Sequence, residues 1–115
     1  MANIPLNYFR RLTQAVTTTP STVYTVPFQR AGIIITALAS NLTNSAQTVT
    51  ISLSSVGTAG SYFDIVKNFQ LPPNDTTNVV LNKLVLGYND SFIITSNNNS
   101  AVNITLSVLE SVNTQ

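Results

Sequence analysis

Strict alternation of apolar and polar residues marks residues 46–54, AQTVTISLS. Val49, Ile51 and Leu53 fall on one side of an extended chain, and the hydroxyl residues between them fall on the other. Because successive side chains of a strand point to opposite faces, this pattern predicts a β-strand with one buried face and one face in water.

The same period of two recurs along the chain. Residues 101–109 repeat it, with an inward stripe of Val102, Ile104, Leu106 and Val108. Further strands are predicted at residues 9–18, 23–26, 62–71, 76–81 and 91–95. The run from Gly32 to Leu38 is apolar at almost every position, which predicts a strand covered on both faces. No segment shows a period of 3.6 residues over three turns.

Turn signals rich in Pro, Gly, Asn and Asp separate these segments at intervals of about 8–12 residues, the spacing typical of a sandwich or barrel. We therefore expect an all-β protein, an antiparallel β-sandwich of jelly-roll type with about eight strands. The length of 115 residues suits one domain. The predicted division is a short N-terminal arm at 1–8, the sandwich at 9–112 and a polar tail at 113–115.

The polar residues are unusual in kind. Only 8% of the chain is charged, against about 25% in an ordinary soluble domain. Asn, Thr and Ser together supply 42 of the 115 residues. Such a surface carries little charge to keep copies apart, which favours a protein that assembles with itself or with other chains, although a neutral monomer is the alternative interpretation.

The net charge of +1 cannot neutralise a row of phosphates, so nucleic-acid binding is not expected. No stretch approaches the roughly 18 apolar residues of a membrane span. The opening residues lack the apolar run of a signal peptide, so we expect synthesis in the cytoplasm.

Catalytic chemistry has few candidates here. The chain contains no His and no Cys, which removes the usual nucleophile–base pairs and the usual zinc ligands. The carboxylates are Asp64, Asp75, Asp90 and Glu110, and their spacing suggests neither a paired-carboxylate site nor a calcium loop. Asp75 and Asp90 are better explained as turn residues. We predict no enzymatic activity, no catalytic or metal-binding residues and no cofactor.

The N-terminal region is the predicted contact site. Its apolar residues precede clear strand alternation, so they favour docking on a neighbouring chain, although a first strand of the chain's own sandwich is equally consistent with them. The predicted interface residues are Ile4, Leu6, Tyr8, Phe9, Arg10 and Arg11.

Several segments resemble small virion proteins of tailed bacteriophages. They are residues 10–14 (RRLTQ), 19–27 (TPSTVYTVP), 84–94 (LVLGYNDSFII) and 102–110 (VNITLSVLE). The third is similar to an LxLxxGDSxxV hairpin of such proteins, with Tyr88-Asn89-Asp90 where Pro-Gly-Asp is commoner. The resemblance spans most of residues 10–110.

This resemblance implies a β-sandwich in the virion, assembled in the host cytoplasm. The primary hypothesis is a capsid decoration (cement) protein that binds itself as a dimer or trimer and stabilises the shell by binding the major capsid protein or another virion protein. A neck, tail, baseplate or fibre-base component is the second. A carbohydrate-binding adhesion module that uses exposed Tyr8, Tyr24, Tyr62 or Tyr88 is the third.

Overall fold

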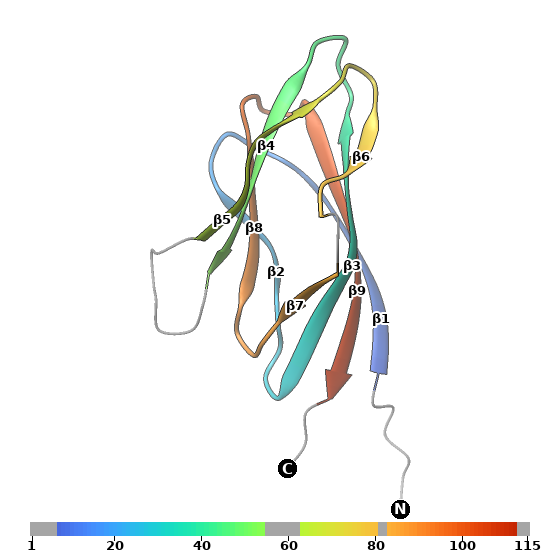
Figure 1. Ribbon diagram of the computed structural model, residues 1–115, viewed down its shortest axis with the longest axis vertical. Helices are drawn as coiled ribbons and strands as arrows, with labels where there is room; N and C mark the ends of the chain where they lie inside the picture. Colours follow the sequence, from blue (N-terminus) through green and yellow to red (C-terminus); the bar gives the residue numbers. More distant parts are fainter. Residues whose placement is uncertain (1–6, 55–62, 81–82, 113–115) are drawn as a thin grey trace, which may run out of the picture.

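The computed structural model describes residues 7–54, 63–80 and 83–112, and the rest of the chain lies outside the described part. Within those ranges the chain forms nine strands (Figure 1). They are β1 (Asn7–Ala15), β2 (Ser21–Thr25), β3 (Arg30–Asn41), β4 (Gln47–Ser54), β5 (Phe63–Leu71), β6 (Thr76–Asn78), β7 (Leu84–Leu86), β8 (Ser91–Ser96) and β9 (Val102–Val112). Among the described residues there is no helix with the length and apolar character needed to cross a bilayer.

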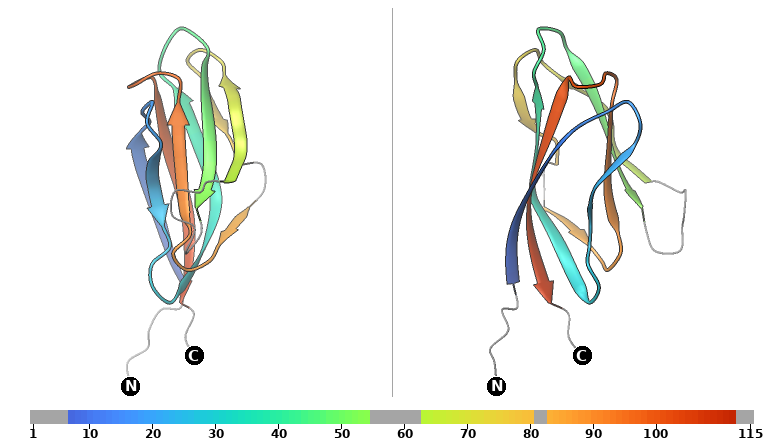
Figure 2. Two further views of the ribbon diagram at one scale, coloured as in Figure 1. Left: turned by 90° about the vertical axis from the view of Figure 1, so that its left-hand side faces the viewer. Right: turned by 180° about the vertical axis from the view of Figure 1, so that it is seen from behind.

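The strands form two antiparallel sheets that pack face to face (Figure 2). One sheet has the order β1-β9-β3-β6, with β7 also paired to β3, and the other has the order β2-β8-β4-β5. The pairs are nested along the chain: β4 with β5, then β3 with β6 and β7, β2 with β8, and β1 with β9. This nesting is a jelly roll, so the predicted fold class is confirmed.

Strand β7 was not among the strands predicted from periodicity, because three residues are too few to show a period. The hairpin implied by the resemblance at residues 84–94 does not form as a strand pair, since β7 belongs to the five-stranded sheet and β8 to the four-stranded sheet. It pairs with Gly32–Ile34 of β3, while β6 pairs with Leu38–Ser40 of the same strand. The two short strands therefore share one position of the jelly roll, and this division accounts for a ninth strand where about eight were expected.

The core lies between the sheets and follows the predicted alternation. The inward stripe of β9 is buried, and so are Ile51 of β4 and Phe92 and Ile94 of β8 on the opposing sheet. Removing each such side chain from water stabilises the fold by about 1.5–3 kcal/mol, so this interface holds the two sheets together.

Strand β3 differs from its prediction in one respect. Ile34, Ala37 and Ala39 are buried in the core, but Ile33 and Ile35 on the other face are only half-buried and Leu38 is exposed. The expectation that this strand is covered on both faces was therefore wrong within the described part of the chain, which supplies only one covering layer.

The side chains of Asp75 and Asp90 accept backbone hydrogen bonds in turns, as predicted for turn residues. Asp90 Oδ2 accepts a hydrogen bond from the Gly87 N–H at 2.9 Å, and Asp75 Oδ1 accepts one from the Thr76 N–H at 2.9 Å. Asn74 and Asn89 have positive φ angles of 55° and 66°, a conformation that Asn tolerates better than most residues.

Strand β1 takes in Asn7 and Tyr8, the last two residues of the expected arm, and pairs with β9 from Asn7↔Ser111 to Ala15↔Asn103. Residues 1–6 of that arm, and the expected tail at 113–115, lie outside the described residues. The start of β1 and the end of β9 lie side by side at one end of the sandwich (Figure 1).

Candidate assembly surface

The outer face of the five-stranded sheet carries apolar residues from four strands in one line. Phe9 of β1 is paired with Leu109 of β9, Leu109 with Ile33 of β3, and Ile33 with Val85 of β7. Directly opposed residues of antiparallel strands share a face. Their neighbours Val108, Ile34 and Leu86 are buried in the core, so these four point outward. We call Phe9, Leu109, Ile33 and Val85 the apolar row.

The two ends of the apolar row are open to solvent. Phe9 is 79% exposed and Val85 is 69% exposed, while Ile33 and Leu109 between them are half-buried. An exposed line of large apolar side chains across four strands is uncommon on a soluble monomer and is typical of a face that another surface covers.

A hollow of about 290 Å³ adjoins the row and is lined by Phe9, Arg10, Arg11, Ile35, Ser107 and Val108. The β3–β9 register shifts between Ile34 and Thr36, which places Ile35 as an extra residue and bends the strand locally. Arg11 is exposed, and no carboxylate of the described residues lies within ion-pair distance of it. The hollow therefore places the apolar side chains of Phe9 and Ile35 beside an accessible positive charge.

A buried carboxylate lies beneath this end of the sheet. Glu110 continues the inward stripe of β9, and its side chain is 0% exposed. Its Oε2 accepts hydrogen bonds from Arg10 Nη1 at 3.0 Å and Tyr24 Oη at 2.6 Å, and its Oε1 accepts one from Arg30 Nη1 at 2.8 Å. We call Glu110, Arg10, Arg30 and Tyr24 the Glu110 cluster. Because Tyr24 belongs to β2, the cluster links the two sheets.

Gly32 makes room for this link. It is paired with Glu110 across β3 and β9. A Cβ at Gly32 would lie 3.0 Å from Tyr24 Oη and 3.1 Å from Tyr24 Cε2, closer than ordinary van der Waals contact. The absence of a side chain at Gly32 therefore allows the Tyr24 ring to cross the core and reach the carboxylate.

The contacts within the cluster determine the ionisation states of Glu110 and Tyr24. Burial raises the pKa of Glu110, but the hydrogen bonds from Tyr24, Arg10 and Arg30 outweigh burial and hold that pKa below its ordinary value. Burial also raises the pKa of Tyr24, and the adjacent Glu110 carboxylate raises it further. Glu110 is therefore ionised and Tyr24 protonated at neutral pH, so a hydrogen-bonded ion cluster stabilises the fold instead of supplying a proton-transfer pair.

The predicted interface residues divide between two faces of β1. Phe9 and Arg11 lie on the outer face, where they contribute to the apolar row and the hollow. Arg10 pairs with Glu110, and Tyr8 lies beneath Arg30, whose guanidinium carbon is 4.6 Å from the centre of the Tyr8 ring. Ile4 and Leu6 lie outside the described residues.

The remaining carboxylates are dispersed. Asp64 accepts a hydrogen bond from Ser52 at 2.6 Å and lies 3.8 Å from Lys67 Nζ, while Asp75 and Asp90 are used in turns. The described ranges contain no group of three His, Cys, Asp or Glu residues that could hold a metal ion. The geometry of these carboxylates offers no paired acid and base.

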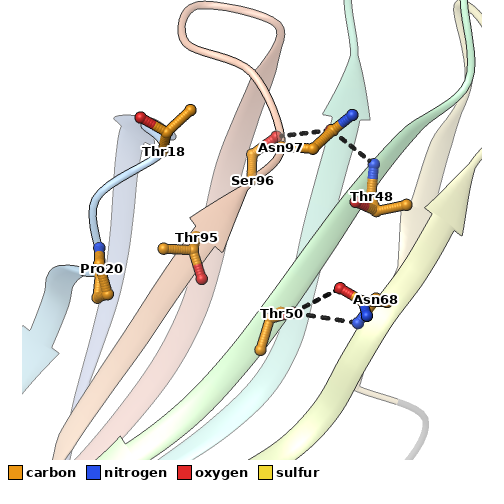
Figure 3. A pocket seen from close by; sticks show the side chains of 8 residues that line it. All are labelled: Thr18, Pro20, Thr48, Thr50, Asn68, Thr95, Ser96 and Asn97. Atoms are coloured by element: carbon orange, nitrogen blue, oxygen red, sulfur yellow. Dashed lines mark hydrogen bonds between the residues drawn. The ribbon is translucent and has the colours of Figure 1, made fainter.

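The outer face of the four-stranded sheet is polar around its hollow. A hollow of about 280 Å³ on the four-stranded sheet is lined by Thr18, Pro20, Thr48, Thr50, Asn68, Thr95, Ser96 and Asn97 (Figure 3). Asn97 accepts a hydrogen bond from the Thr48 N–H at 2.9 Å, and Thr50 accepts one from the Asn68 N–H at 3.1 Å. The lining contains neither a charge nor an aromatic ring on which a sugar could stack.

Most of the tyrosines considered for sugar binding are buried or contact other side chains of the chain. Tyr24 is buried, and Tyr8 is half-buried beneath Arg30. Tyr88 is exposed and makes an edge-to-face contact with Phe28 at 5.4 Å between ring centres. Tyr62 lies outside the described residues.

Most of the apolar row, and the contacts that join the Glu110 cluster, were not predicted from the sequence. Both left a signal in the sequence. The consecutive Ile33, Ile34 and Ile35 place apolar groups on both faces of one strand, and Glu110 occupies the next inward position after Val108. The partners of these residues depend on the strand register, which the sequence does not specify.

Comparison with known proteins supports the fold. No family model matches the chain, and no curated protein matches it. Among solved structures, the chain is similar to a protein of the Bacillus endospore appendages, described as disulfide-linked pili, with a TM-score of 0.57 and 10% identity over 100% of this chain and 98% of that chain. It is also similar to a chain of the T13 IBDV viral particle, with a TM-score of 0.57 and 7% identity over 95% of this chain and 32% of that chain. At these identities the likeness establishes the all-β sandwich and no more.

Proposed function

We propose that the chain is a structural subunit of a virion, a bacteriophage capsid decoration protein that binds the capsid shell through the outer face of its five-stranded sheet. The apolar row carries this proposal, because its side chains lie on the outer face of the central strand β3 and its neighbours, where the described residues supply no covering layer. The phage-like motifs and the jelly-roll fold, which a viral-particle chain shares, support the proposal.

The chemistry of this face matches docking on a protein surface. Burying Phe9 and Val85 would contribute about 1.5–3 kcal/mol each, before the costs of association. Arg11 beside the row would pair with a carboxylate of the shell, which adds orientation to the apolar contact. Since the chain has no cysteine, a disulfide cannot hold it on the shell.

The proposed contact residues follow from their positions. Phe9 and Arg11 contact the shell together with Leu109, Ile33 and Val85. Tyr8 and Arg10 support that surface from beneath. Ile4 and Leu6 extend the contact from the N-terminal arm.

The test is binding to purified particles that lack the protein. The double variant Phe9→Ser with Val85→Ser should bind at least about 100-fold more weakly, because two anchors of the row are lost. Phe63→Ser is the matched control, since Phe63 is 61% exposed on β5 of the other sheet. Unchanged binding of the double variant, or equal loss in the control, would contradict docking through the row.

The arm is tested separately by deleting residues 1–6, which leaves all of β1 in place. The truncated chain should fold and should bind particles more weakly than the full chain. Normal binding by a folded truncated chain would remove Ile4 and Leu6 from the proposed contact.

The position on the particle is tested by counting copies. A shell protein is present in many copies spread over the capsid, whereas a neck, tail or baseplate protein forms a ring of few copies at one site. Quantitative mass spectrometry of purified particles, with labelling in electron micrographs, separates the two. Absence of the protein from particles would refute the virion proposal altogether.

A further inference from the structure

The sandwich has four sheet edges, and three of them are interrupted. β2 has five residues with a register shift between Thr22 and Tyr24. β5 has two register shifts against β4 and a positive φ of 52° at Asn68. The edge beyond β3 is divided between β6 and β7, which have three residues each. Bulges and short strands of this kind prevent another strand from pairing along an edge.

The fourth edge, β1, is continuous. All nine residues of β1 pair with β9 in one unbroken register, with neither Pro nor Gly among them. On its other side β1 pairs with no strand of the described residues. β1 therefore presents an uninterrupted row of backbone N–H and C=O groups, which is a template for strand addition.

We propose that two copies of the chain dimerise by pairing β1 with β1 antiparallel, about a two-fold axis perpendicular to the sheet. The two five-stranded sheets then form one continuous sheet. A second copy fits this edge because it supplies an equally regular strand of equal length, and a two-fold axis closes the contact without leaving a further edge of the same kind open.

The arginines select the register. Directly opposed residues of an antiparallel pair must lie on the same face of the sheet. In a two-fold symmetric pair this holds only when one residue of β1 lies opposite its own copy across the axis, and the pairing is then centred on that residue. Centring on Arg10 or Arg11 places like charges opposite each other. Centring on Leu12 pairs Arg11 with Thr13 of the second copy, and this register keeps seven residues of β1 in the ladder. Arg10 in this register faces Gln14 of the second copy, and its charge is already paired with Glu110.

This register has a geometric result that goes beyond the proposed docking on a shell. An axis perpendicular to the sheet keeps both apolar rows on the same side of the joined sheet. Phe9 of each copy lies next to Ala15 of the other, so the dimer presents two neighbouring rows to one surface. Two linked contacts bind more tightly than one, without new chemistry.

Sedimentation equilibrium of the purified full chain tests the dimer without any particle, so its failure would not touch the docking proposal. Thr13→Glu should lower the dimer dissociation constant about fivefold, because two Arg11–Glu pairs form across the axis. Thr13→Arg should raise that constant by at least as much, and adding Arg11→Glu to Thr13→Arg should restore it. Thr22→Glu and Thr22→Arg on β2 are the matched controls, since Thr22 is exposed on a neighbouring edge.

A cross-link provides a second measurement that does not depend on charge. The native chain has no cysteine, so Arg11→Cys and Thr13→Cys each carry one thiol. Oxidation of an equal mixture should give mainly the mixed disulfide, because these positions face each other across the axis. A chain that is monomeric at all accessible concentrations, charge variants that leave the constant unchanged, or disulfides formed at random would each overturn the proposal.

Discussion

The two outer faces of this sandwich are both formed by antiparallel strands, but they differ in surface chemistry. On the four-stranded sheet, the outward positions of β4 and β8 are mainly hydroxyl residues such as Thr48, Thr50 and Thr95, whose hollow is lined by amides and hydroxyls (Figure 3). On the five-stranded sheet, the outward positions that form the apolar row run across four strands, from Phe9 of β1 to Val85 of β7.

The difference shows which face is built to remain in water. A hydroxyl on a strand keeps its hydrogen bonds to solvent, so the polar face needs no partner. An exposed Phe and Val beside half-buried Ile33 and Leu109 leave a free-energy gain that only a covering surface can realise. The Glu110 cluster lies beneath the apolar face and fixes β1, β3 and β9 around it.

The largest expected effect comes from removing the charge beneath the apolar face. Glu110→Gln leaves Arg10 and Arg30 without their buried anion, and the free energy of unfolding should fall by about 3 kcal/mol. Asp64→Asn is the matched control on the other sheet, where a partly exposed pair with Lys67 should contribute less than about 1 kcal/mol. Urea unfolding measures both, and equal losses would contradict the central role of Glu110.

Gly32→Ala should have the next largest effect, a loss of about 2 kcal/mol, because the new methyl group forces the Tyr24 ring away from Glu110. Gly87→Ala is the control, since its Cβ would meet only Asp90 Oδ2 at an ordinary 3.5 Å. Thermal unfolding should separate the two variants by several degrees. A Gly32→Ala protein as stable as the control would show that the ring moves without cost.

The contribution of Glu110 to the free energy of unfolding should decrease as the pH falls. Its pKa is lower in the folded chain than in the unfolded chain, so the unfolded chain takes up a proton first as the pH falls. The stabilisation is therefore complete above about pH 5 and is lost as the pH drops through the folded pKa. The stability gap between the native chain and Glu110→Gln should shrink between pH 7 and pH 3. A gap that stays constant would contradict this assignment.

The smallest effects should come from exchanging surface chemistry between the faces. Ile33→Thr should cost about 1 kcal/mol of stability and weaken particle binding, because it interrupts the apolar row. Thr95→Val on the polar face should change stability by less than about 0.5 kcal/mol and leave binding unaltered. Denaturation and cosedimentation measure the two properties, and equal loss of binding in both variants would erase the functional distinction between the faces.

Much of the fold could be predicted because alternation reports burial directly. The stripe from Val102 to Val108 predicts β9, and Val49 to Leu53 predicts β4. Periodicity could not predict strand β7, since Leu84–Leu86 has too few residues to show a period. The hairpin-like motif at residues 84–94 marks an extended segment there, but nothing local indicates that it shares a strand position with β6.

The candidate surface was less predictable, because it depends on register. Phe9 and Arg11 were predicted as contact residues from the apolar, charged opening of the chain. Leu109 and Ile33 join them only because β9 lies between β1 and β3. The same opening includes Tyr8 and Arg10, which the pleat directs toward the Glu110 cluster. The inward position of Glu110 indicates a buried carboxylate, but no local pattern identifies the residues that pair with it.

The nested strand order also affects the order in which the strand pairs form during folding. β4 and β5 are near in sequence, whereas Asn7 meets Ser111 almost a full chain length away. Because closing a long loop costs more entropy than closing a short one, we expect the β1–β9 ladder to form last, after the inner pairs have brought its strands together. The contact between Phe9 and Leu109, and the continuous edge of β1, then exist only in a finished molecule. A chain still folding would have no assembled surface to offer, so the topology would delay assembly until folding is complete.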